Sequence, residues 1–159
     1  MLTRRSLIIL PLALAAVGAA GYGWRALNTA PQQAVYAEEG LAIRGTDPVA
    51  YFTDAAPVPG DPAITADWNG ATWRFATAAN RDAFVADPDA YAPQYGGWCA
   101  WAVAEKGQLF TTQPENWKIV DGKLYLNFSD QVQADWNKDI PGFIAEGDRR
   151  WPMILAAAQ

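Results

Sequence analysis

Two turn dipeptides, Asn69-Gly70 and Asp121-Gly122, constrain the fold of this chain more than any other feature of its sequence. Asparagine or aspartate followed by glycine favours the tight primed turn of a β-hairpin, because both central residues of that turn need positive φ. Apolar and polar residues alternate on both sides of each dipeptide, as in strands with one buried face. The sequence therefore predicts hairpins within residues 64–77 and 117–128, in which Leu124, Leu126 and Phe128 share a face.

Short helices are predicted around these hairpins. Thr77 and Ser129 are good N-cap residues for helices that follow them, and Ile140-Pro141 is a favourable start for a last helix. Residues 98–105 contain no proline or glycine, which predicts a short helix after Gly96-Gly97. An alternating segment at residues 41–43 predicts a further strand. With 159 residues, the chain is expected to form one small α+β domain of antiparallel hairpins packed by several short helices.

The first 30 residues have the layout of an export signal followed by a tether. Arg4 and Arg5 precede an apolar run at residues 7–20 and then small residues, and the two arginines resemble a twin-arginine signal. The folded domain is expected at residues 35–155. The sequence thus predicts a periplasmic or otherwise exported protein, whose only contact with a membrane would be an uncleaved N-terminal segment.

The charge of the chain excludes some partners. Removal of residues 1–30 takes away three of the 12 basic residues and none of the 17 acidic ones, so the net charge falls from −5 to −8. An acidic surface without a basic cluster argues against nucleic acid and anionic lipid as partners. The sequence contains no nucleotide-binding loop, and without histidine it contains no Ser-His-Asp triad.

Cys99 is the only cysteine, and the chain has no histidine. An exported chain with one cysteine cannot form an internal disulfide, so the thiol is buried, bound to a ligand or paired between two chains. Close to a helix start, a thiolate is stabilised by free backbone N–H groups. A free cysteine is also among the residues most often buried in a core. The sequence leaves both interpretations of Cys99 open.

Three long segments carry a family resemblance. They are "GTDPVAYF", "WNGATWRFATAANRDAFVADPDAYAPQYGGWCAWAV" and "WKIVDGKLYLNFSDQVQADWNKDIPGFIAEGDRRWP", and they span most of the chain between Gly40 and Pro152. In these segments the chain resembles the exported YHS-domain proteins of bacteria. The resemblance implies a YHS-like α+β fold and a metal-binding function, since the wider YHS group comprises small domains thought to bind metal, which occur attached to copper-transporting ATPases.

The chain departs from this family at expected ligand positions. Ala76 stands where the wider group has a cysteine, and residues 65–68 lack the histidine that the exported proteins often carry. One cysteine cannot complete a zinc site, and the chain has no histidine to serve as an axial ligand of haem. Copper(I) accepts thiolate sulfur at low coordination, so the sequence predicts a copper(I)-handling module with Cys99 as ligand and no catalysis of its own. Two chains could supply two thiolates in a homodimer, whereas Met153 is expected in the core.

Two alternatives belong to other functional classes. Cys99 could be the reactive thiolate of a redox enzyme or sensor, although the chain offers no resolving cysteine or histidine base. Alternatively, Tyr95, Trp98 and Trp101 could line an aromatic groove that binds a small ligand or another exported protein, with Cys99 merely packed beside it. Trp98 and Trp101 are three positions apart and would share a helical face.

Overall fold

A computed structural model of the chain describes residues 34–157. The predicted export signal with Arg4 and Arg5 lies outside the described residues. Within the described part, none of the helices has the length and apolar character that crossing a membrane requires.

The first hairpin belongs to a four-stranded sheet. Its strands, in spatial order β1-β2-β4-β3, are β1 (Ala37–Glu38), β2 (Leu41–Ala42), β4 (Ala71–Phe75) and β3 (Asp61–Trp68). β3 and β4 pair antiparallel with Trp68 opposite Ala71, and β2 pairs parallel with β4. Asn69 and Gly70 have φ of 49° and 80°, which confirms the primed turn.

The second hairpin forms a two-stranded sheet of β5 (Gln113–Val120) and β6 (Lys123–Asn127), as predicted. Leu124 and Leu126 are buried, but Phe128 is 41% exposed, so the prediction that it shares their buried face is wrong. β6 ends at Asn127, and the chain then turns into the cap of the next helix. Phe128 therefore no longer follows the alternation of the strand.

The helices are short except for the last one. They are η1 (Ile43–Gly45), α2 (Ala50–Thr53), α3 (Ala78–Ala86), α4 (Pro88–Tyr91), η2 (Gln94–Gly97), α5 (Ala100–Lys106), α6 (Asp130–Trp136) and α7 (Ile140–Ala157). The predicted caps are confirmed: the Thr77 and Ser129 hydroxyls accept from the backbone N–H of Asn80 and Val132 at 3.1 and 3.3 Å. The strand expected at residues 41–43 stops at Ala42, because Ile43 has a φ of 37° that a strand does not allow.

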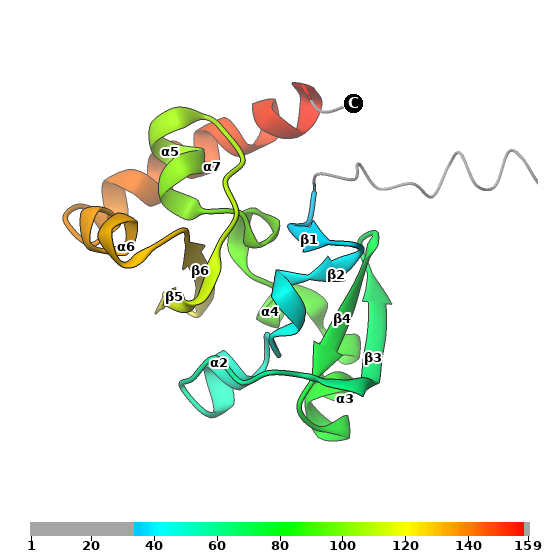
Figure 1. Ribbon diagram of the computed structural model, residues 1–159. Helices are drawn as coiled ribbons and strands as arrows, with labels where there is room; N and C mark the ends of the chain where they lie inside the picture. Colours follow the sequence, from blue (N-terminus) through cyan, green and yellow to red (C-terminus); the bar gives the residue numbers. More distant parts are fainter. Residues whose placement is uncertain (1–33, 158–159) are drawn as a thin grey trace, which may run out of the picture.

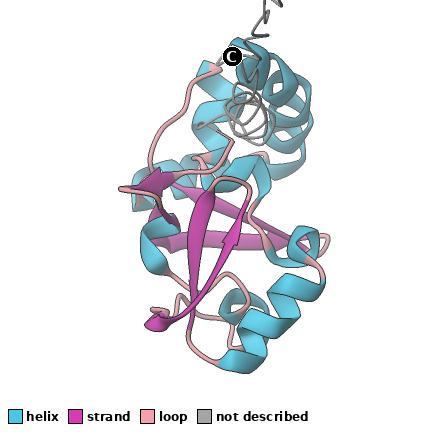
Figure 2. Cartoon of the chain, turned by 90° about the vertical axis from the view of Figure 1, so that its right-hand side faces the viewer, coloured by secondary structure: helices cyan, strands magenta, loops and turns pink. Residues whose placement is uncertain are grey.

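Strand β6 separates two cores. Its alternate residues Leu124 and Leu126 pack into the sheet core, which is built around Trp73, Phe75 and Phe84, whereas Tyr125 points into the helix core with Tyr95, Val103 and Trp136. Helices α5, α6 and α7 gather at the end of the molecule that holds the helix core, while β3, β4 and α3 lie at the opposite end (Figures 1 and 2). The sequence prediction of a small α+β domain is thus confirmed, with a core on each side of one strand.

Two left-handed turns meet between these cores. Ile43, Arg44 and Gly45 all have positive φ, and so do Tyr95, Gly96 and Gly97. The turns are joined through Tyr36, whose N–H donates to the Gly96 carbonyl at 2.9 Å and whose carbonyl accepts from the Ile43 N–H at 3.0 Å. A Cβ on Gly97 would lie only 2.6 Å from Cγ2 of Ile43. The glycine pair is therefore needed both for its backbone conformation and for close packing.

Candidate functional site

Cys99 is sealed inside the protein. It is the N-cap residue of α5, and its side chain has no exposed surface. Its backbone N–H donates to the Phe110 carbonyl at 3.0 Å, and its carbonyl accepts from the Val103 N–H at 3.0 Å. The predicted position at a helix start is therefore confirmed, and the thiol faces the interior.

The thiol has polar neighbours in this interior. Its Sγ lies 3.5 Å from Oδ1 of Asn127, which also accepts from the backbone N–H of Trp101 at 3.0 Å. The Asn127 amide in turn donates to Gln133 at 2.9 Å. Burial raises the pKa of the Cys99 thiol, and hydrogen bonds from backbone N–H groups, including that of Ala102, counteract this only in part. At neutral pH the side chain is thus a protonated hydrogen-bond donor to Asn127.

The surroundings of Cys99 do not fit a metal site within one chain. Among residues 34–157, no group of three or more His, Cys, Asp or Glu side chains is placed to hold a metal ion. Met153, the thioether expected in the core, is 54% exposed on α7, so that expectation is wrong. Helix α7 turns this position to solvent because its inner face is occupied by Ile144, Trp151 and Ile154. The copper(I) hypothesis would need a rearrangement that exposes the thiol or brings a second chain to it.

The three aromatic candidates Tyr95, Trp98 and Trp101 point in different directions. Tyr95 is buried and lines a cavity, which is described below. The Trp98 ring packs 5.0 Å from the Tyr36 ring and contacts both cores. Trp101 is half-buried on α5, with Nζ of Lys106 5.2 Å from its ring centroid. Of the three, only Tyr95 belongs to the lining of that cavity.

A cavity of about 400 Å³ lies where the two cores adjoin. Its aromatic wall comes from three distant parts of the chain: Trp68 at the end of β3, Tyr95 in η2 and Trp151 on α7. The wall also includes Asp89 from α4 and Lys123 from β6, together with the amides of Asn69 and Gln94. The lining is of mixed polarity, and a hollow that combines aromatic side chains with a few polar groups is a common form of small-molecule site.

Tyr95 is held firmly in this wall. Its hydroxyl donates to the Asp148 carboxylate at 2.9 Å and lies 3.2 Å from the Ile144 carbonyl oxygen. The ring passes over Gly147, where a Cβ would lie 2.5 Å from the hydroxyl oxygen, and its centroid is 5.7 Å from that of Trp151. Burial, followed by the hydrogen bond to Asp148, raises the pKa of Tyr95. This part of the wall is therefore neutral and preformed.

Another hollow, of about 440 Å³, lies at the first hairpin turn and shares Trp68 and Asn69 with this cavity. Its lining consists of Gly40 and residues 67–72, so one hairpin turn supplies nearly all of it. The cavity beside Tyr95 instead takes side chains from both cores. We therefore regard the cavity beside Tyr95 as the candidate site.

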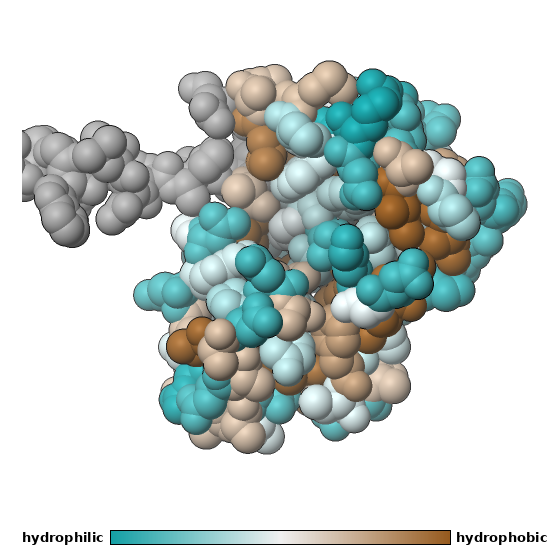
Figure 3. Space-filling view, turned by 180° about the vertical axis from the view of Figure 1, so that it is seen from behind, coloured by the Kyte–Doolittle hydropathy of each residue, from teal (hydrophilic) through white to brown (hydrophobic). Residues whose placement is uncertain are grey.

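Exposed apolar side chains do not mark a competing site. Val85 on α3 and Met153 on α7 are exposed at separate places, and Phe110 and Phe128 form one edge-to-face pair with centroids 6.2 Å apart. The face seen in Figure 3 likewise carries hydrophobic surface in separate strips between hydrophilic groups. Scattered apolar side chains are normal on a protein surface and need no partner.

Sequence reasoning found one of the aromatic wall residues and missed the others as site residues. Trp68 was predicted only as a strand residue, and Asp89, Lys123 and Trp151 gave no sign of a site, because they are ordinary residue types spread over more than 60 positions.

Comparisons with protein-family models, with curated proteins and with solved structures gave no match to this chain. The resemblance to exported YHS-domain proteins therefore stays a prediction, and the candidate site rests on its own geometry.

Proposed function

We propose that this protein is a binding module for a small molecule, with the cavity beside Tyr95 as its site. The observation that carries the proposal is an aromatic wall contributed by β3, η2 and α7 around about 400 Å³ of space. That volume lies within the range of about 300–1,000 Å³ that is typical of ligand pockets. It corresponds to the aromatic-groove alternative of the sequence analysis, but with Trp68 and Trp151 in place of Trp98 and Trp101.

Strain in the backbone supports this assignment. Tyr95 is a non-glycine residue with a φ of 54°, and such left-handed residues cost of order 1–3 kcal/mol each. Strained residues persist where surrounding contacts hold them, and they cluster at ligand and active sites. Here the hydrogen bond to Asp148 and the following Gly96-Gly97 pair hold Tyr95 with its ring in the cavity wall.

The chemistry of the lining favours binding over turnover. The only thiol of the chain is Cys99, which is not part of the lining, and the Tyr95 hydroxyl is already engaged with Asp148. The thiol and this hydroxyl are therefore not free for acid–base or nucleophilic chemistry, while the two charged side chains of the lining, Asp89 and Lys123, can pair with charges of a bound molecule. The aromatic rings and amides of this wall instead offer stacking surface and hydrogen bonds.

The proposal is tested by nuclear magnetic resonance of the ¹⁵N-labelled full chain, titrated with a library of small aromatic compounds. Binding at the site is expected to shift the indole signals of Trp68 and Trp151 and the backbone amides of Ala92 and residues 94–96. Trp151→Ala should weaken binding about tenfold or more, given about 1–3 kcal/mol for stacking on one aromatic ring. Trp101→Ala, a half-buried tryptophan away from the cavity, is the matched control. Hits whose shifts fall elsewhere, or which bind Trp151→Ala unchanged, would refute the proposal.

The copper(I) and thiol-redox hypotheses stay predictions with their own test. Anaerobic titration of the full chain with copper(I) against a competing chelator, in wild type and Cys99→Ala, reports whether the thiol is a ligand. Copper uptake that is lost in the variant and accompanied by dimer formation would support a site shared by two chains. Uptake that survives in Cys99→Ala would exclude Cys99 as the key ligand.

A further inference from the structure

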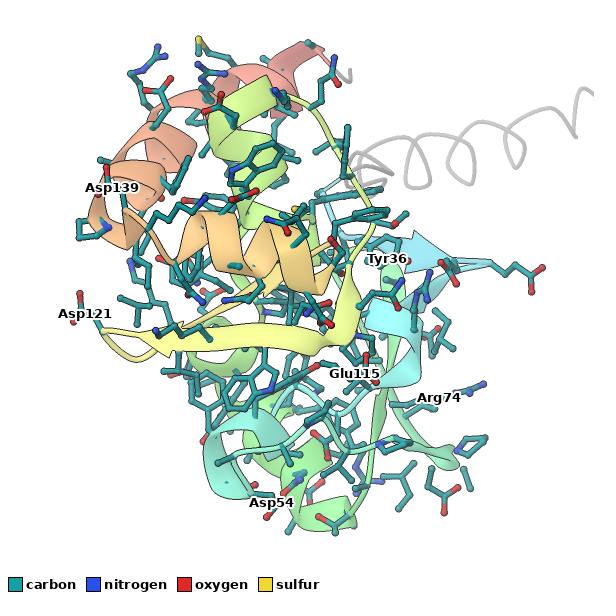
Figure 4. All side chains as sticks on the ribbon, turned by 60° about the vertical axis from the view of Figure 1, so that its left-hand side comes forward. Tyr36, Asp54, Arg74, Glu115, Asp121 and Asp139 are labelled. Carbon is teal, nitrogen blue, oxygen red and sulfur yellow. The ribbon has the colours of Figure 1, made fainter. Side chains whose placement is uncertain are left out.

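The wall of the cavity contains one group of each charge. Asp89 lies in the first turn of α4, and Lys123 is the first residue of β6, next to the turn at Asp121-Gly122. Figure 4 shows Asp121 at the free tip of this hairpin. Both Asp89 and Lys123 are exposed, and neither forms a salt bridge with the other or with any residue of the described range 34–157. Both charges are therefore available to a ligand.

This balance selects among ligand classes. A ligand with a single charge would meet one attractive and one repulsive group in the wall, and a neutral ligand would pair with neither. A molecule with both a carboxylate and an ammonium group carries an opposite charge for each of Lys123 and Asp89, and opposite charges across an interface favour the correct partner. The aromatic side chains of Trp68, Tyr95 and Trp151 would then cover its apolar part.

We propose that the ligand is a small zwitterion with an aromatic or large apolar side chain, that is, a molecule of the amino-acid class. This inference rests on the proposed function, because it concerns the same cavity. Lys123 receives the carboxylate, Asp89 receives the ammonium group, and the aromatic wall receives the side chain. The amides of Asn69 and Gln94 add donors and acceptors for the same polar end.

Three compounds with the same ring and chain length test the ligand class by calorimetric titration of the full chain. Phenylalanine is the zwitterion, 3-phenylpropionate lacks the ammonium group, and phenethylamine lacks the carboxylate. Phenylalanine is expected to bind about two- to fivefold more tightly than either analogue, the size of effect that exposed charge pairs produce.

Variants assign each charge to its partner. Lys123→Met should abolish the preference for phenylalanine over phenethylamine, and Asp89→Asn should abolish the preference over 3-phenylpropionate. Lys118→Met and Asp54→Asn remove one exposed charge of each sign outside the lining and should leave all affinities unchanged; Figure 4 shows Asp54 near α2, away from the hairpin tip. All four side chains are exposed, and thermal melting of each variant checks its fold.

The outcomes separate this inference from the proposed function. Equal binding of all three compounds with shifts at Trp68 and Trp151 would overturn the zwitterion and leave the cavity as a binding site. The same holds if an analogue binds more tightly than phenylalanine. If the library of aromatic compounds as well as these three probes gives no shift at the cavity, the proposed function itself fails.

Discussion

Tyr95 and Cys99 are four residues apart in one glycine-rich segment and both are buried, yet only the Tyr95 side chain borders a cavity. Tyr95 stands in a left-handed turn and forms part of an open cavity wall, whereas Cys99 begins α5 and is fully enclosed. The residue with the more reactive side chain is the less accessible one. The rarity of a residue type in the sequence therefore does not show whether its side chain is accessible to a ligand; packing determines that.

The two environments also differ in how polar atoms are satisfied. The Tyr95 hydroxyl reaches across to α7, where Asp148 is exposed to solvent. The Cys99 thiol contacts Asn127, which is itself fully buried and which also accepts the Trp101 N–H. Tyr95 therefore bonds directly to a surface carboxylate, whereas the Cys99 thiol is connected to the surface only through Asn127 and Gln133.

The largest expected effect concerns access to the Cys99 thiol. Because the side chain is buried and its pKa is raised, a thiol reagent should label the native protein about a thousandfold more slowly than the unfolded one, since it must await an opening event. The rate of labelling is measured with and without denaturant. Rapid stoichiometric labelling of the native chain would show that Cys99 is accessible, and would support the redox and copper(I) hypotheses.

Gly97→Ala tests the junction between the two left-handed turns. The added Cβ would meet Ile43 Cγ2 at 2.6 Å in a backbone with a φ of 88°, so we expect a loss of about 2–4 kcal/mol in the free energy of unfolding. Chemical denaturation measures it. Gly122→Ala is the control, because Gly122 has a φ of 73° with no atom within 4 Å of its added Cβ. An equal loss in both variants would mean that close packing at Gly97 contributes nothing.

Asn127→Ala tests the hydrogen bonds beside Cys99. The variant leaves the buried N–H of Trp101 and the thiol of Cys99 without their acceptor, which should cost about 1–3 kcal/mol. Denaturation of the variant and of Gln108→Ala, an exposed amide side chain, gives the measurement and its control. A cost below about 0.5 kcal/mol, roughly the effect of an ordinary surface substitution, would show that the hydrogen bonds accepted by Asn127 do not contribute to stability.

Tyr95→Phe is expected to have a smaller effect on stability. It removes the hydroxyl that donates to Asp148 but keeps the ring, so a loss of about 0.5–1.5 kcal/mol in stability is expected with ligand binding retained. Denaturation and the titrations described above measure the two quantities. Complete loss of binding in a folded variant would assign the hydroxyl itself, and not the ring, to the ligand.

The last prediction concerns alkaline pH. Burial, followed by the charges of Asp148 and Asp121, raises the pKa of Tyr125 from 10.0 to about 12. The folded state therefore keeps its proton where the unfolded state has lost it, so the contribution of Tyr125 to stability is complete below pH 10 and declines between pH 10 and about 12. Tyr125→Phe should show a shallower loss of stability over this range. An unchanged slope would mean that Tyr125 titrates normally in the folded protein.

The local elements follow from the amino-acid sequence alone. Asn69-Gly70 and Asp121-Gly122 dictate tight turns, and Thr77 and Ser129 cap the helices that follow them, because these preferences depend on residues only a few positions apart. The α+β class follows from the order of these elements. Where a prediction depended on the next packing partner, as for Phe128 and Met153, it was wrong.

Which distant residues meet depends on the tertiary structure. Trp68, Asp89, Lys123 and Trp151 share a cavity with Tyr95 because β6 divides the interior into two cores whose side chains adjoin there. The burial of Cys99 likewise depends on strand β6 and on the Phe110 segment closing over α5. Turns and caps are settled by short-range sterics and hydrogen bonds, whereas a cavity and a sealed thiol arise from contacts between segments distant in the chain.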